Sequence, residues 1–300
     1  MTTTITPQSA GSGFSQSFKR ETRKWRRTSR WYKQAVLWTI LFGILAFLFY
    51  TLLAPVSWLI NMMNEVYAFV SDPSAMALVR TLSRQGNVVP SVQFSSASLV
   101  LPLIFAAAYT IIAQALIVVF NSQFFEELNR GTLKWSFSRA ITRGAYSISK
   151  ALADNLGTLI MTVLIPFGVI FIITLAAAKE NTITPLNYLA TAVLMMLGFV
   201  FWHALVMALI FVTRRRALSF GIPVLLLLLG GPLSRMLDGA LNTTLISQLS
   251  PWTSRNLFTS MLNGTLDFGD SAVIIPILAT AVWAILLYLI AWLALRKADI

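Results

Sequence analysis

The chain holds six long apolar runs, separated by short intervals that carry most of its charged residues. A helix needs about 20 mostly apolar residues to cross a hydrocarbon core, because lipid offers the backbone no hydrogen-bond partner. The runs predict an all-α, polytopic membrane protein. We expect its transmembrane helices near residues 35–60, 98–121, 151–178, 187–212, 217–237 and 271–295. The fifth run contains several Gly and Pro residues, which predict a kinked or partly re-entrant helix.

Composition agrees with this fold class. Hydrophobic residues make up 57% of the chain and charged residues 11%, and the charges leave no stretch long enough for a separate soluble domain. We therefore expect a single transmembrane domain over 34–300, preceded by a disordered tail at 1–13. Between them, 14–33 combines aromatic residues near one helical stripe with many Lys and Arg residues. This pattern is typical of an amphipathic helix on an anionic membrane surface, and the alternative is a disordered basic segment.

The basic residues predict how the helices are oriented. If the N-terminal tail, the 122–150 loop, the 214–216 turn and the C-terminal tail share one side, 18 of the 23 Lys and Arg residues lie there. Basic loops stay cytoplasmic, so both termini are expected in the cytoplasm. Because the positive charges lie at the membrane edges, the net charge of +12 gives no reason to expect a nucleic-acid partner.

Two charged or ionisable residues and one apolar stretch allow further predictions. Asp154 follows Lys150 by one helical turn, which favours an ion pair between them. The only histidine, His203, lies within the fourth run, where a neutral, hydrogen-bonded role inside the bundle competes with a role in binding substrate or protons. The apolar stretch 238–270 is expected to pack at the outer interface or to dip inward.

Catalytic and cofactor signatures are missing from the sequence. It has no cysteine, no Gly-x-x-x-x-Gly-Lys-Ser/Thr phosphate-binding loop, no His-x-x-x-His pattern and no paired intramembrane carboxylates. We therefore expect no catalytic residues, no metal and no cofactor in this chain, and no enzyme activity.

The loop at 122–150 is the most informative interval. Its first part places two aromatic residues directly before two acidic ones, so it resembles a short amphipathic element at the membrane surface. We expect Phe124 and Phe125 to face lipid or neighbouring helices, and Glu126, Glu127 and Arg130 to face water. Gly131 then permits a sharp turn.

This interval resembles the permease subunits of bacterial ABC-type exporters. Their signature is a Glu, a Gly-Thr-Leu after three intervening residues, a small polar residue and an Arg. The residues that match in order and spacing are Glu127, Gly131, Thr132, Leu133, Ser138, Thr142, Arg143 and Lys150. The chain departs from the signature at Ala140, where the family usually has Pro, and at Ser149, where it usually has Gly. The turn geometry near 140–149 is therefore open.

The resemblance implies that the loop docks into a groove on a separate cytoplasmic ATP-binding subunit, which binds the ATP and Mg. The coupling residues would be Glu126, Glu127, Arg130, Gly131, Thr132, Leu133 and Arg143. Among them, Glu127 and Arg130 would dock or form local salt bridges, Gly131 would set the turn, and Arg143 would anchor the third span.

The resemblance also implies a setting: a bacterial cytoplasmic (inner) membrane, with a second copy of the chain or a homologous permease as partner. The second and fifth spans would line a pathway for an outward-moving substrate.

Two other functions are compatible with the topology. A non-transporting membrane anchor or assembly subunit of a larger complex would have the same helices, and only the 121–150 signature argues against it. An integral membrane enzyme acting on lipid needs a cluster of His, Asp or Glu near one interface, and the sequence offers only scattered acids on its outer side.

Overall fold

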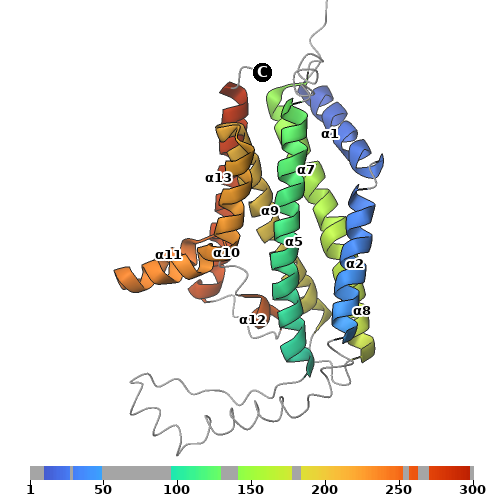
Figure 1. Ribbon diagram of the computed structural model, residues 1–300, viewed down its shortest axis with the longest axis vertical. Helices are drawn as coiled ribbons and strands as arrows, with labels where there is room; N and C mark the ends of the chain where they lie inside the picture. The colour runs from blue at the N-terminus through green and yellow to red at the C-terminus, as the bar shows by residue number, and fades with distance from the viewer. Residues whose placement is uncertain are drawn as a thin grey trace, which may run out of the picture.

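The computed structural model describes residues 10–27, 30–48, 96–129, 141–177, 184–252, 257–262 and 270–297. Within these ranges every regular element is a helix (Figure 1). Six of the helices are long and apolar enough to cross a membrane, which confirms the all-α, six-span prediction. They are α2 (Arg30–Leu48), α5 (Ser96–Asn129), the continuous helix of α7 (Arg143–Gly157), η2 (Thr158–Leu164) and α8 (Ile165–Ala177), α9 (Pro185–Thr213), α10 (Arg216–Leu241) and α13 (Ser271–Lys297). The shorter helices are α1 (Ala10–Arg27), α11 (Leu245–Leu249) and α12 (Phe258–Leu262).

Helix α9 forms the centre of the bundle. In its most apolar stretch 72% is buried inside the bundle, against 22% in the corresponding stretch of α13. The reason is that α9 packs against α5, α10 and α13 at once. Thr184 caps its start by accepting a hydrogen bond from the Asn187 N–H at 3.2 Å, and Pro185 occupies the first turn, where its missing N–H costs nothing. A helix that is apolar on all sides is typical of a protein core or of a membrane span, and α9 is packed inside the bundle.

The helices that flank the predicted 122–150 loop are longer than the sequence suggested. Helix α5 continues to Asn129, and α7 begins at Arg143, where Thr142 accepts a hydrogen bond from the Ala145 N–H at 3.1 Å. Helical structure therefore covers 122–129 and 143–150. The physical reason is that Phe124 and Phe125 are buried, so the apolar face of α5 extends one full turn into the charged segment.

The third span contains a seven-residue π-helical segment, η2, which ends two residues before Pro166. Proline has no N–H to donate to the carbonyl one turn earlier, and the backbone widens here, with the Ile165 N–H bonded to the Ile160 carbonyl. The span remains one continuous helix from Arg143 to Ala177.

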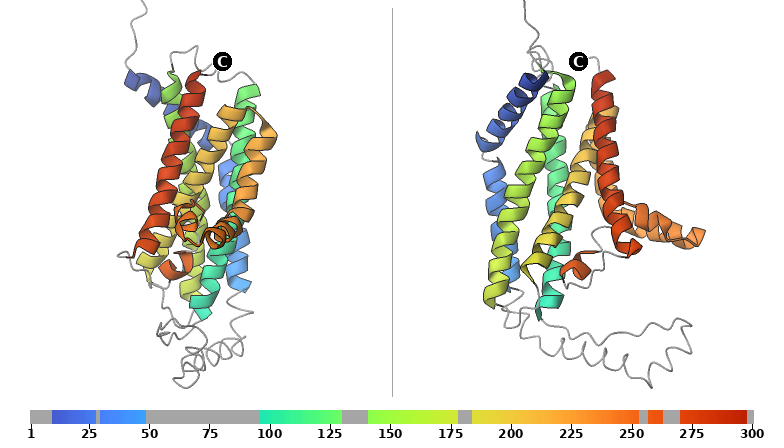
Figure 2. Two further views of the ribbon diagram at one scale, coloured as in Figure 1. Left: turned by 90° about the vertical axis from the view of Figure 1, so that its left-hand side faces the viewer. Right: turned by 180° about the vertical axis from the view of Figure 1, so that it is seen from behind.

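Helix α10 is also continuous, and Pro223 and Pro232 lie inside it. After α10 the chain returns towards the bundle. The Trp283 Nε1–H donates to the Leu249 carbonyl at 3.0 Å, and the Thr280 hydroxyl donates to the Pro251 carbonyl at 2.9 Å. Thr280 and Trp283 lie about 14 and 18 Å along α13 from its first residue. The described part of 238–270 therefore reaches the middle of α13. The last turns of α10 project sideways from the bundle, and α11 leads the chain back to it (Figure 2).

The N-terminal basic segment forms α1, which runs from Ala10 to Arg27, and α2 begins at Arg30. Helix α1 packs obliquely along α7, at the end of the bundle where α5 ends and α7 starts (Figure 1). It is therefore docked on protein over much of its length. This contact creates the site described next.

Candidate functional site, a buried ion cluster

Lys150 lies at the centre of a cluster of charged side chains. Its Nζ is 3.2 Å from Asp154 Oδ2, 3.3 Å from Glu127 Oε1 and 3.4 Å from Glu21 Oε2. The Lys150 side chain is only 4% exposed. The predicted Lys150–Asp154 pair is confirmed, and carboxylates from α1 and α5 join it. We call Glu21, Lys24, Glu127, Lys150 and Asp154 the ion cluster.

Helix α1 reaches the cluster through one narrow face. Gly13, Ser17 and Glu21, spaced four residues apart, are buried, and the Ser17 and Ser149 hydroxyl oxygens lie 2.6 Å apart. The Glu21 carboxylate also accepts hydrogen bonds from Arg20 and Lys24, each at 3.1 Å. Close approach of the two helices requires small residues at this face, and Gly13, Ser17 and Ser149 provide them.

Helix α5 contributes Glu127, which the sequence analysis expected to face water. That expectation was wrong. The Glu127 carboxylate pairs with Lys24 at 3.0 Å as well as with Lys150, and it accepts a hydrogen bond from the Tyr146 hydroxyl. Because α5 stays helical, Glu127 lies one turn beyond the buried ring of Phe124, on the same face. Glu126 lies on the neighbouring position and is half-buried.

The cluster continues inward to His203. This side chain is fully buried on α9, and its Nε2 lies 3.4 Å from Asp154 Oδ2. Its Nδ1 lies 2.8 Å from the Tyr288 hydroxyl, which also accepts a hydrogen bond from Asn155 Nδ2 at 2.7 Å. The prediction that His203 is hydrogen-bonded inside the bundle is confirmed.

Arg143, the first residue of α7, lies outside the ion cluster. Its guanidinium donates to the carbonyl oxygens of Leu295 at 3.4 Å and Arg296 at 2.5 Å. These carbonyls are at the C-terminal end of α13, where a cation is favoured by the unpaired backbone acceptors. Arg143 therefore ties the start of the third span to the end of the sixth.

The remaining predicted coupling residues, Arg130, Gly131, Thr132 and Leu133, lie outside the described residues. The sequence did not predict four participants: Glu21, Lys24, Tyr146 and Tyr288. A signal existed for Glu21, because it is the only acid in the first 64 residues and sits within a strongly basic segment. Nothing in the sequence marks Tyr146 or Tyr288 as partners of charged groups.

The cluster joins helices through buried charges. Within the described ranges, no group of three or more His, Asp or Glu side chains is placed to hold a metal ion. The Lys150 ammonium occupies the position where the carboxylates converge. Each carboxylate is paired with at least one cation, as buried charges require. The result is a bonded path from α1 and α5, through α7, to α9 and α13.

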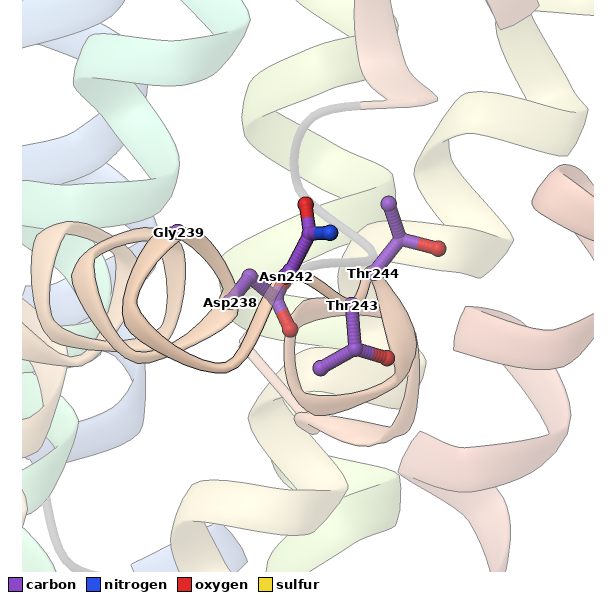
Figure 3. Close-up of a pocket in the computed structure, with 5 residues that line it drawn as sticks. All are labelled: Asp238, Gly239, Asn242, Thr243 and Thr244. Atoms are coloured by element: carbon purple, nitrogen blue, oxygen red, sulfur yellow. The ribbon is translucent and has the colours of Figure 1, made fainter.

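An open pocket of about 400 Å³ lies at the turn between α10 and α11. Asp238, Gly239, Asn242, Thr243 and Thr244 line it (Figure 3). The Asp238 carboxylate accepts the backbone N–H groups of Ile246 at 2.9 Å and Ser247 at 3.0 Å. Its charge thus serves to cap α11, and we do not assign this pocket as the functional site.

Comparison of the sequence with models of known protein families and with curated proteins finds no match.

Proposed function

We propose that this chain is the permease subunit of an ATP-driven ABC exporter in a bacterial cytoplasmic membrane. A separate cytoplasmic subunit binds and hydrolyses ATP, and a second copy of this chain or a homologous permease completes the transporter. Three features support the proposal: the six helices that can span a membrane, the 121–150 signature, and the way the ion cluster holds the ends of that interval.

The observation that carries the proposal is the Glu127–Lys150 ion pair. Both residues belong to the signature, one near the end of α5 and the other on the second turn of α7. Their 3.3 Å contact joins the two helices on either side of 130–142. In this proposal α5 and α7 move together because of this pair, which is what a docking element placed between them requires.

The ion cluster supplies stiffness to this connection. Lys24 on α1 and Lys150 on α7 both pair with Glu127 Oε1, so a displacement of α5 also strains α1 and α7. The Arg143 contact extends the connection to α13. In this proposal closure of the ATPase subunits pushes on 130–142, and the paired helices tilt as one body.

The second and fifth spans, α5 and α10, line the substrate pathway in this proposal. They lie side by side and are joined by a hydrogen bond from Asn121 Nδ2 to the Ser219 hydroxyl at 2.9 Å. Tilting of α5 therefore moves α10 as well. The exposed apolar face of α10 would then lie along the interface with the second permease.

The test is a pull-down of the tagged chain from its native membranes in mild detergent. We expect an ATP-binding protein to co-purify and to give the complex vanadate-sensitive ATPase activity. Gly131→Trp changes the signature and leaves every residue of the ion cluster unchanged, so it should release this protein. The matched control is Arg215→Gln, in the short turn between α9 and α10 at the same end of the bundle.

Loss of the ATPase from Gly131→Trp alone supports a coupling role for the interval. If both variants retain the ATPase, the interval is not its docking element. If no ATPase co-purifies under conditions that keep other membrane complexes intact, the permease assignment fails, and a non-transporting anchor or assembly subunit becomes the better assignment.

A further inference from the structure

Gln114 is a polar side chain in the middle of the span formed by α5. It lies about 15 Å along the helix from the start of the apolar span, and a hydrocarbon core is about 30 Å thick. Between Tyr109 and Asn121 the other polar residue is Thr110, whose hydroxyl donates to the Ala106 carbonyl at 3.0 Å. Among the described residues, Gln114 has no such partner. An unpaired amide is costly at this depth, because lipid chains can neither donate nor accept a hydrogen bond.

The face of α5 that carries Gln114 points away from the bundle. Ile111 and Val118, on the same face, are 41% and 50% exposed, and Gln114 itself is half-buried. Figure 1 shows α5 at the front of the bundle, with no described helix drawn in front of it. The described helices therefore leave this face open to a partner from outside the chain.

This face has the pattern of a helix–helix contact. Its central residues are spaced by four, three and four positions, as in the seams of left-handed helix pairs: Ala107, Ile111, Gln114 and Val118. Ala107 is small and exposed, so a second helix can approach closely here. The segment 96–125 contains no charged residue, so the Gln114 amide is the strongest hydrogen-bonding group that this face offers.

A second copy of the chain supplies the partner that the amide lacks. A primary amide both donates and accepts, so two glutamines can satisfy each other. Two copies that enter the bilayer in the same orientation form a closed dimer about a twofold axis along the membrane normal, which brings each residue to the depth of the same residue in the other copy. The two Gln114 side chains can therefore meet, and hydrogen bonds of this kind stabilise helix association in lipid.

We propose that α5 forms a symmetric contact with a second copy of this chain, in which the two Gln114 amides hydrogen-bond to each other in the middle of the bilayer. In the proposed transporter, whose pathway α5 and α10 line, the paired amides close that pathway at mid-depth. This role rests on the proposed function, whereas the contact itself does not.

The test is disulfide cross-linking between copies of the full-length chain in native membranes. The chain has no cysteine, so Val118→Cys places one reporter thiol in each copy, one turn from Gln114 on the same face. A membrane-permeant oxidant should convert the chain into a covalent dimer. Ile285→Cys is the matched control, because Ile285 is 67% exposed near the middle of α13 and reports random collisions at a similar depth.

A second substitution tests the amide itself. Gln114→Leu in the Val118→Cys chain removes the amide and keeps a good helix former. We expect the initial rate of dimer formation to fall about fivefold, which corresponds to the loss of an interhelical hydrogen bond of about 1 kcal/mol. Gln114→Asn keeps an amide and should retain part of the rate.

Two outcomes overturn the proposal. One is a Val118→Cys chain that forms no dimer, or forms it no faster than Ile285→Cys. The other is a dimer that forms equally fast with and without Gln114→Leu, because the amide then does not hold the contact. Ile111→Cys provides a second reporter on the same face if the Val118→Cys chain does not reach the membrane. No ATPase takes part, so a failed cross-link leaves the pull-down of the ATPase subunit as an independent test of the proposed function.

Discussion

The ion cluster holds Lys150 almost completely buried between helices, where an unpaired charge would be strongly destabilising. Lys150 has three carboxylate partners within 3.4 Å, and its ammonium also lies 5.5 Å from the centre of the Phe124 ring. Removing one partner from such a network leaves other charges buried and uncompensated. The lysine should therefore contribute strongly to stability, although inserting the whole cluster is costly.

The first prediction follows from this position. Lys150→Met keeps the length and apolar stem of the side chain but leaves Glu21, Glu127 and Asp154 facing one another. We expect a loss of stability of about 3–5 kcal/mol, measured as thermal or denaturant unfolding of the purified chain in detergent. Lys24→Met is the control, because Lys24 is 43% exposed and its pairs are worth about 1 kcal/mol or less.

A double variant separates charge from packing. Lys150→Met with Asp154→Asn removes one of the stranded carboxylates, so it should recover part of the lost stability. If the double variant is as unstable as the single one, the loss comes from packing of the lysine stem rather than from its charge.

At the scale of elements, the contact between α5 and α9 depends on a glycine, Gly198, which has no side chain beyond hydrogen. A Cβ atom on Gly198 would lie 2.5 Å from the Tyr109 hydroxyl oxygen. Tyr109 cannot move aside easily, because it is buried, stacks on Phe199 at a centroid distance of 5.3 Å, and accepts a hydrogen bond from Trp202 Nε1 at 2.8 Å. Small residues allow this close approach in membrane bundles.

The second prediction tests this packing. Gly198→Ala should destabilise the chain by about 1–3 kcal/mol, the usual range for overfilling a packed core. Gly221→Ala on α10 is the matched control, since no atom lies within 4 Å of its added Cβ. In a helix interior that control is expected to be neutral or slightly stabilising. Equal unfolding temperatures for the two variants would contradict the assignment of Gly198 as a contact point.

Helix α1 owes its position to tertiary contacts rather than to the lipid surface alone. The sequence predicts an amphipathic helix there, and Lys19 and Arg23 are indeed exposed. The buried face, however, is the small and acidic one, Gly13, Ser17 and Glu21. An acid among basic residues is attracted to Lys150 on α7, and this attraction selects the docked orientation.

At the scale of the whole molecule, an even number of spans places both chain ends on one side. The six candidate spans among the described residues thus predict that the two termini share a side, and the distribution of Lys and Arg predicts that this side is cytoplasmic. The ion cluster would then lie towards the cytoplasmic end of the bundle.

The third prediction concerns this topology. Since the chain has no cysteine, single cysteines at Thr3, Asp299 and Ser271 can be labelled with a membrane-impermeant maleimide in oriented vesicles. We expect Thr3→Cys and Asp299→Cys to react in inside-out vesicles, and Ser271→Cys, at the opposite end of α13, to react in right-side-out vesicles. Labelling of the two terminal cysteines from opposite sides would contradict the six-span topology.

The sequence by itself determined the number and approximate extent of the spanning helices. The reason is that the length of an apolar stretch is a local property, and it decides for each segment separately whether that segment can cross the bilayer. It also predicted the Lys150–Asp154 pair, whose members are one turn apart on the same helix. It could not predict that Glu127 turns inward, since this depended on α5 staying helical past Phe124.

Only the tertiary structure decided the long-range partners. Glu21 meets Lys150 across 129 residues of chain, and His203 meets Tyr288 across 85. No spacing rule covers such pairs, because they depend on which helices lie side by side and at what depth. In a low-dielectric interior each buried charge must find a partner, and the packing of α1, α5, α7, α9 and α13 determines which partner that is.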